Sequence, residues 1–170
     1  ASRDEAIRKL RDNEFIYVSG GNVFYLLREL ARTGIGEMIA EQIREGKQYI
    51  GESAGSVILA PDIEYANLMD DPSAAPGLTG FTGLNAVDFY PVPHFGNIPF
   101  KEAGNKIVER YGNALPLRTF GNSEYIEVIG NTVTVTHGKK LDRTTLGKAV
   151  MGFLTKTSCM TRRIGKPPLT

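Results

Sequence analysis

The residues of this sequence best suited to nucleophilic chemistry form the pentapeptide Gly51-Glu52-Ser53-Ala54-Gly55. Small residues two positions before and two positions after a serine allow a sharp strand-to-helix turn that exposes the hydroxyl. Residues 48–50 are typical of the end of a buried strand, and residues 56–60 of a helix whose free N–H groups and positive dipole end would face the serine. The sequence therefore predicts that Ser53 is a nucleophile, although a chain with 19 glycines can also contain this pattern by chance.

A serine hydroxyl needs an adjacent base, and histidine is the usual one because its pKa lies near the operating pH. The chain contains two histidines. His94 ends an apolar strand expected over residues 87–95, whereas His137 ends an expected hairpin, where it would be exposed to solvent. His94 is therefore the predicted base, and the alternative is a histidine with a structural role.

The base in turn needs a group that orients it, and a carboxylate is the expected one. The chain order serine, acid, histidine places this group between Ser53 and His94. Five acidic residues qualify: Asp62, Glu64, Asp70, Asp71 and Asp88. Asp70 and Asp71 are favoured because they lie in a loop between core elements, whereas Asp62 and Glu64 could equally cap or solvate a helix end.

Backbone N–H groups that stabilise the developing oxyanion would complete the site. The N–H of Ala54 is one predicted donor, and the Gly20-Gly21 turn is predicted to supply the other, unless it is only a tight turn. Asn22 follows in the same turn and is the predicted substrate-binding residue. The sequence contains no phosphate-binding loop or dinucleotide fingerprint, and two isolated histidines make no metal site, so no cofactor or metal is expected.

The elements that must position these residues alternate between helix and strand. Strand, glycine turn and helix occur twice, which predicts an α/β fold with a parallel sheet, helices on both faces and the two glycine turns at the carboxyl ends of the strands. Helices are expected over 2–11, 23–33, 35–45 and 100–111, strands over 14–18, 48–50 and 87–95, and a hairpin over 125–136 around Gly130-Asn131. Residues 61–83 form an expected long loop of the kind that is often functional.

Length and composition predict one hydrolytic α/β domain over residues 1–153, followed by a tail over 154–170 of uncertain structure. The chain has 170 residues, of which 41% are hydrophobic and 23% charged, with a net charge of +1. This balance does not favour nucleic-acid or membrane partners. The absence of a secretory signal and of a long apolar run predicts a cytoplasmic protein.

Three segments together resemble one known family: Ser19-Gly20-Gly21-Asn22, the Ser53 pentapeptide, and Gly80-Phe81 through Pro93-His94-Phe95. The chain resembles the aspartyl dipeptidase (peptidase E) family of serine peptidases, relatives of the cyanophycinases, over roughly residues 14–137. The resemblance implies a flavodoxin-like sheet related to class I glutamine amidotransferase domains, with Ser53 as nucleophile and His94 as base. It also implies cytoplasmic hydrolysis of short peptides with an N-terminal aspartate, without metal or cofactor.

The sequence departs from the family pattern in three ways. Members have a further region before the strand at Glu14 that contains the first strands of the sheet, so a fragment or short form is expected, with a homodimer covering the open sheet edge. The Asp-x-Pro pattern of the family acid is best matched by Asp70 with Pro72. The arginine that holds the substrate aspartate has no counterpart in residues 96–108, where only Lys101 and Lys106 are cationic, so a strict preference for aspartate is not expected.

These observations predict a serine peptidase acting on short peptides. One alternative is a hydrolase for another aspartate-containing amide or an ester. The other is a catalytically inactive or truncated family member that acts as a binding or scaffold protein.

Overall fold

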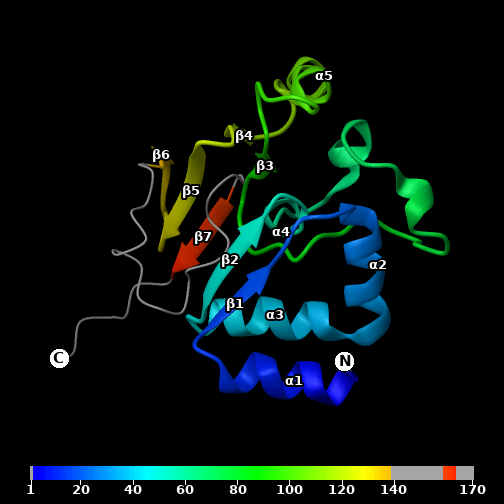
Figure 1. The fold of residues 1–170 in the computed structure, drawn as a ribbon, viewed down its shortest axis with the longest axis vertical. Coiled ribbons are helices and arrows are strands. Elements are labelled where there is room, and N and C mark those ends of the chain that lie inside the picture. The colour runs from blue at the N-terminus through cyan, green and yellow to red at the C-terminus, as the bar shows by residue number, and fades with distance from the viewer. Residues whose placement is uncertain (1, 139–158, 164–170) are drawn as a thin grey trace.

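The computed structural model describes residues 2–138 and 159–163. Its helices are α1 (Arg3–Asp12), α2 (Val23–Thr33), α3 (Ile35–Arg44), α4 (Ala54–Val57) and α5 (Lys101–Tyr111), with short 3-10 helices η1 (Glu64–Leu68) and η2 (Pro72–Ala74). Its strands are β1 (Phe15–Val18), β2 (Gln48–Glu52), β3 (Tyr90–Val92), β4 (Leu117–Thr119), β5 (Glu124–Ile129), β6 (Thr132–His137) and β7 (Cys159–Arg163). Up to β2 the helices and strands alternate as the sequence predicts (Figure 1).

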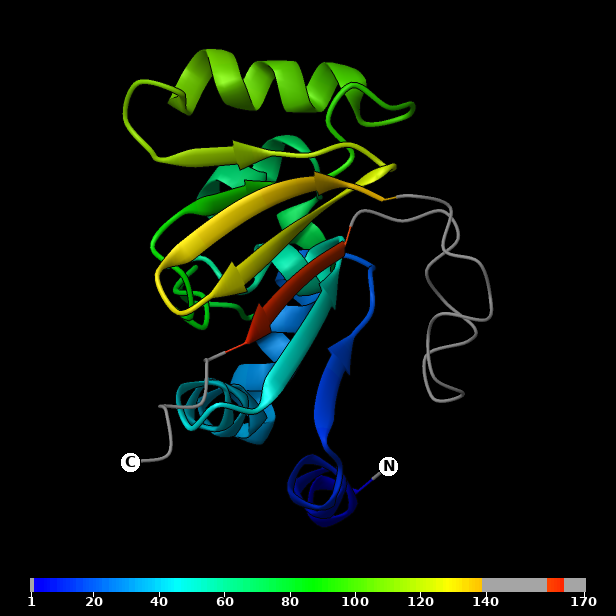
Figure 2. The same cartoon turned by 90° about the vertical axis from the view of Figure 1, so that its left-hand side faces the viewer.

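Five strands form one sheet in the order β1-β2-β7-β5-β6, which Figure 2 shows from blue through cyan and red to yellow and orange. β1 and β2 are parallel, β7 is antiparallel to β2 and parallel to β5, and β5 and β6 form the expected hairpin. The α/β class is confirmed, but this sheet is mixed rather than parallel throughout. The strand that joins the parallel pair to the antiparallel hairpin, β7, lies within residues 154–170, and three of its five residues are polar and give no alternating signal.

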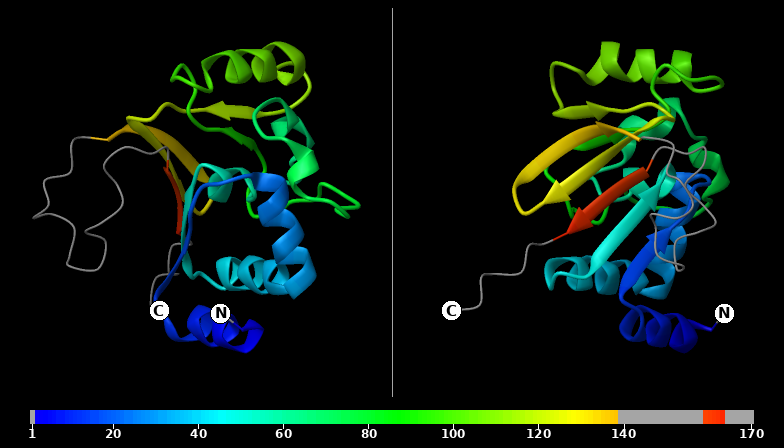
Figure 3. Two further views of the ribbon diagram at one scale, coloured as in Figure 1. Left: turned by 45° about the vertical axis from the view of Figure 1, so that its right-hand side comes forward. Right: turned by 60° about the vertical axis from the view of Figure 1, so that its left-hand side comes forward.

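Helices α2 and α3 lie together on one side of this sheet (Figure 3, left). Asn22 caps α2 by accepting a hydrogen bond from the Tyr25 N–H at 3.0 Å, and Gly34 ends the helix with a φ of 67°. Of the apolar positions expected on one side of α2, Val23, Leu27 and Leu30 are buried and Leu26 is partly buried, and Phe24 is buried as well. Burial of each such side chain stabilises the fold by about 1.5–3 kcal/mol.

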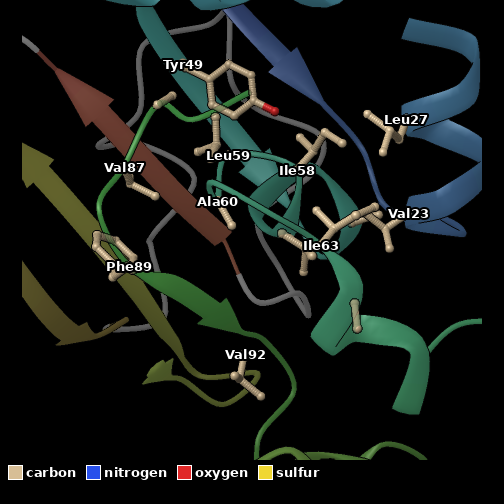
Figure 4. Packing of buried hydrophobic residues seen from close by; sticks show 14 of the residues in the cluster. Val23, Leu27, Tyr49, Ile58, Leu59, Ala60, Ile63, Val87, Phe89 and Val92 are labelled. Carbon is tan, nitrogen blue, oxygen red and sulfur yellow. The ribbon is translucent and has the colours of Figure 1, made fainter. Parts of the chain in front are cut away.

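The core beneath the sheet also receives the segment that follows the serine turn. Figure 4 shows Ile58 and Ile63 in the same cluster of buried side chains as Val23 and Leu27 of α2 and Tyr49 of β2. Ile58, Ile63 and Tyr49 are fully buried. Packing on this scale fixes the backbone on both sides of Ser53, so the core anchors the turn.

A second, two-stranded parallel sheet pairs β3 with β4, and α5 lies above it (Figures 1 and 2). The expected strand over residues 87–95 is thus shortened to Tyr90–Val92, and β4 had no counterpart in the sequence prediction. The buried Tyr65 of η1 supports β3 by donating its hydroxyl hydrogen to the Pro91 carbonyl at 2.5 Å. Because β3 and β4 are parallel, the segments that follow them emerge at the same edge.

Within the described part of the chain, no helix has both the length and the apolar character that crossing a membrane requires.

Candidate active site

The turn that carries Ser53 is built by close backbone packing. A methyl group on Gly51 would lie 2.2 Å from the Gly55 carbonyl oxygen, and one on Gly55 would lie 2.2 Å from the Val18 carbonyl oxygen. Both distances are far below van der Waals contact, so only glycine fits at either position. The two small residues that the sequence pattern requires therefore have a steric cause in this fold.

Ser53 itself has a strained backbone, with φ 50° and ψ −114°. Its carbonyl accepts hydrogen bonds from the backbone N–H of Ser56 at 2.8 Å and from the buried Ser56 hydroxyl at 2.6 Å. These bonds hold a conformation that costs about 1–3 kcal/mol, and such strain is typical of a nucleophile turn. The helix that follows, α4, has only four residues, so its dipole contributes less than the sequence pattern suggested.

His94 meets the serine as predicted. Its Nε2 lies 2.9 Å from Ser53 Oγ, and its ring stacks on Phe100 with the ring centroids 4.9 Å apart. His94 also has a positive φ of 59°, a conformation that it shares with only two other non-glycine residues of the described chain, Ser53 and Asn85. The strained backbone and the stacked ring both restrict where the imidazole can point.

The residue at the other ring nitrogen was not predicted. Asn122 Oδ1 lies 2.7 Å from His94 Nδ1. An amide oxygen only accepts hydrogen bonds, so this contact places the imidazole proton on Nδ1 and leaves the lone pair of Nε2 directed at Ser53. In this arrangement the amide orients the imidazole, and the imidazole can activate the serine hydroxyl as a nucleophile.

The parallel pairing of β3 and β4 brings His94 and Asn122 together. His94 lies two residues after β3, and Asn122 lies three residues after β4. Asn122 lies outside the chain order serine, acid, histidine, which places the orienting group before His94, and it is not a carboxylate. The sequence marks a turn at Gly121 after residues 115–120, but it does not show which strand β4 pairs with.

The two favoured carboxylates hold other parts of the chain. Asp70 Oδ2 accepts a hydrogen bond from the Val23 N–H at 2.8 Å, at the start of α2. Asp71 caps η2 by accepting hydrogen bonds from the Ser73 N–H and hydroxyl at 2.9 and 2.7 Å, and the hydroxyl contact is the first cause of its lowered pKa. Of the remaining candidates, Asp62 accepts a hydrogen bond from the Glu64 N–H at 2.7 Å, and Glu64 and Asp88 are exposed.

Substitution of Asp70 separates a structural role from a catalytic one. Asp70→Ala leaves the buried Val23 N–H without its acceptor and is expected to lower the free energy of unfolding by about 1–2 kcal/mol. Asp70→Asn keeps an acceptor oxygen and is expected to keep kcat within about threefold, because Asp70 bonds to Val23 and acts on His94 through its charge, while Asn122 is the group at His94 Nδ1. A much larger loss of kcat in Asp70→Asn would contradict this assignment.

The buried contact between Asp70 and the Val23 N–H also predicts that stability depends on pH. Burial raises the pKa of Asp70 above its ordinary value of 3.8, against the opposing effects of the Val23 hydrogen bond and of the charge on His94. The folded state therefore binds the proton more tightly than the unfolded state, and stability falls as the pH rises from 3.8 through the raised pKa. In urea unfolding, Asp70→Asn should have a higher free energy of unfolding than the wild type at neutral pH, and this difference should disappear on acidification.

The Gly20-Gly21 turn lies against the nucleophile. A methyl group on Gly20 would lie 3.1 Å from Ser53 Cβ, and Gly21 has a φ of 140°. Ala54, the other predicted oxyanion donor, is the buried first residue of α4. Asn22 lies next to this turn, where its Oδ1 caps α2 and its Nδ2 donates to the Asp71 carbonyl at 2.9 Å.

In the described residues, no group of three or more His, Cys, Asp or Glu side chains is placed to hold a metal ion.

Comparison with known proteins identifies the family. The sequence model of peptidase family S51 matches residues 1–136. The chain belongs to peptidase family S51. A crystal structure of a candidate peptidase E protein from Listeria monocytogenes EGD-e is similar to this S51 chain, with a TM-score of 0.74 and 44% sequence identity over 82% of this chain and 67% of that one.

Curated relatives of this chain are also named as peptidases. It is 50% identical to the uncharacterised peptidase PM1590 of Pasteurella multocida over 81% of this chain and 66% of the relative. It is also 50% identical to the uncharacterised peptidase Lin0382 of Listeria innocua, over 75% of this chain and 61% of that relative. Peptidase E of Shewanella sp. strain ANA-3 is 40% identical over 52% of this chain and 36% of its own length. The resemblance to the peptidase E family is therefore confirmed, and the chain spans less than two thirds of the length of these curated relatives.

Proposed function

We propose that this chain is a serine peptidase that cleaves short peptides through Ser53, His94 and Asn122. The observation that carries the proposal is the contact of Ser53 Oγ with His94 Nε2 at 2.9 Å, combined with that of His94 Nδ1 with Asn122 at 2.7 Å. Membership of a peptidase family supports the choice of an amide bond as substrate.

In the proposed reaction, His94 Nε2 takes the Ser53 proton as Oγ forms a bond to the substrate carbonyl carbon. The imidazolium then gives that proton to the amine nitrogen as the carbon–nitrogen bond breaks, leaving an ester on Ser53. Water, deprotonated by His94, hydrolyses the ester and restores the serine. The N–H of Ala54 and those of the Gly20-Gly21 turn are the proposed donors to the carbonyl oxygen.

Asn122 is proposed as the orienting group in place of Asp70 or Asp71. An amide holds the tautomer of His94 without a charge, as the asparagine of papain-like proteases does. The imidazolium formed during the reaction then has an amide instead of a carboxylate at Nδ1, although the charge of Asp70 also acts on His94. We therefore expect a slower enzyme than one with a serine, histidine and carboxylate triad.

For substrate choice, we propose short peptides without a strict requirement for N-terminal aspartate. Lys101 and Lys106 are both exposed on α5, where they are poor counterparts of a buried arginine that binds a carboxylate in two places. A homodimer and a cytoplasmic location remain predictions, and sedimentation would measure the first.

A fluorophosphonate probe followed by intact-mass analysis tests the proposal, because the probe reacts with an activated serine hydroxyl. We expect one adduct on the wild type and none on Ser53→Ala. Ser2→Ala, which changes an exposed serine at the start of α1, is the matched control and should label fully. An unlabelled wild type would refute the proposal and favour the inactive binding or scaffold protein.

A further inference from the structure

The side chain of Asn97 joins the two turns that carry the proposed base and its partner. Its Oδ1 accepts a hydrogen bond from the backbone N–H of Asn122 at 2.9 Å. Its own backbone N–H donates to the His94 carbonyl at 2.9 Å. One half-buried residue thus connects the backbone of His94 to the backbone of Asn122.

This link continues the pairing of β3 and β4 past the ends of both strands. The Phe120 N–H donates to the Val92 carbonyl, and the Phe95 N–H donates to the Phe120 carbonyl, each at 3.1 Å. Beyond Phe95 the chain turns through Gly96, which has a φ of 75°. The next hydrogen bond between the two segments is then made by the Asn97 side chain instead of by the backbone.

The turn that receives this bond is held on two sides. The Gly121 N–H donates to Glu124 Oε2 at 2.6 Å, while the adjacent N–H of Asn122 donates to Asn97. A methyl group on Gly121 would lie 3.1 Å from Asn97 Oδ1 and 3.3 Å from the Phe95 carbonyl oxygen. The turn thus packs closely against Asn97, with little room for a side chain at Gly121, and both of its consecutive N–H groups are bonded to side chains.

We propose that Asn97 is a positioning residue that sets the tautomer of His94. By holding the Asn122 backbone, Asn97 keeps Asn122 Oδ1 against His94 Nδ1, so that the neutral imidazole carries its proton on Nδ1. The lone pair of Nε2 is then available to accept the proton of Ser53. This inference rests on the proposed function, because it gives Asn97 a part in activating the nucleophile.

The test is ¹⁵N NMR of the two histidine side chains at a pH of about 8.5, well above the ordinary histidine pKa of about 6.5. We expect the Nδ1–H tautomer for His94 in the wild type and a shift towards Nε2–H in Asn97→Ala. Asn97→Asp keeps an acceptor oxygen in the same place, so His94 should have the wild-type tautomer in this variant. The exposed His137 gives a second signal in each sample and reports on pH and folding.

Kinetics provide the second readout. We expect kcat to fall about ten- to a hundredfold in Asn97→Ala with KM changed less than twofold, since misplacement of a catalytic group acts mainly on the chemical step. Asn105→Ala, which removes an exposed asparagine from α5, is the matched control and should match the wild type in both measurements. Asn97→Leu, similar in size but without an acceptor, gives the same comparison if the alanine variant does not fold.

An unchanged His94 tautomer in a folded Asn97→Ala or Asn97→Leu would overturn the proposal, and so would a failure of Asn97→Asp to restore it. The tautomer is measured without substrate or probe, so it is independent of whether the protein cleaves peptides. The two proposals can therefore be told apart even in a protein that the fluorophosphonate leaves unlabelled. An Asn97-dependent tautomer in such a protein would support the positioning role and refute only the proposed function.

Discussion

Replacing His94 with alanine is expected to lower kcat by about 10⁴-fold or more, because loss of one member of a serine-based triad removes most of the rate acceleration. Nε2 lies 2.9 Å from Ser53 Oγ, the distance of a direct proton transfer. Steady-state kinetics on a panel of short peptides measure the effect. KM should change much less than kcat, since the imidazole acts on the reacting atoms.

The sequence contains a matched control for this substitution, because His137 is the second of its two histidines. His137 ends β6, its side chain is 82% exposed, and it contacts Glu124 at 3.2 Å. An exposed pair of this kind contributes about 0–1 kcal/mol to stability. His137→Ala should therefore keep kcat within about twofold. Similar losses in both variants, or a His94→Ala enzyme within tenfold of the wild type, would exclude His94 as the base.

The positions of the proposed nucleophile and base were predictable because their signals are local. Gly51 and Gly55 surround Ser53 at a fixed spacing, and steric contact between backbone atoms enforces that spacing in the fold. His94 follows an apolar run that ends in a turn. Such short-range patterns depend on covalent geometry and on the helix and strand periods, which a sequence displays directly.

Asn122 could not be predicted in the same way. It carries no charge, and its position depends on β4, a three-residue strand that is too short to show alternation. Its meeting with His94 results from a parallel pairing between segments more than twenty residues apart in sequence, which no local pattern encodes. The same reasoning applies to β7, whose place between β2 and β5 depends on pairing alone.

The carboxylates show how cap chemistry imitates a catalytic signal. Asp71 precedes Pro72 at the start of η2, and an aspartate before a proline is a typical helix start. Asp70 meets the first N–H of α2 through tertiary contact. Recognising the Asp71-Pro72-Ser73 cap would have removed one of the two favoured acids from the sequence alone.

Replacing Gly55 with alanine is expected to destabilise the protein by about 3 kcal/mol or more, the upper range for overpacking a well-filled interior. The new methyl group would lie 2.2 Å from the Val18 carbonyl oxygen and 2.9 Å from its carbon. These are backbone atoms of β1, so no side chain can rotate away to relieve the contact. Either β1 moves away from the serine turn or the turn opens.

Thermal unfolding measures this effect, and Tm should fall by about 6 °C or more for a domain of this size. Gly80→Ala is the matched control, because a methyl group there meets nothing within 4 Å and its backbone is not left-handed. We expect Gly80→Ala to keep its Tm within about 2 °C of the wild type. An equally small change in Gly55→Ala would show that the turn tolerates a larger residue. The glycine spacing around Ser53 would then have no steric basis, and the agreement between the sequence pattern and the turn would be accidental.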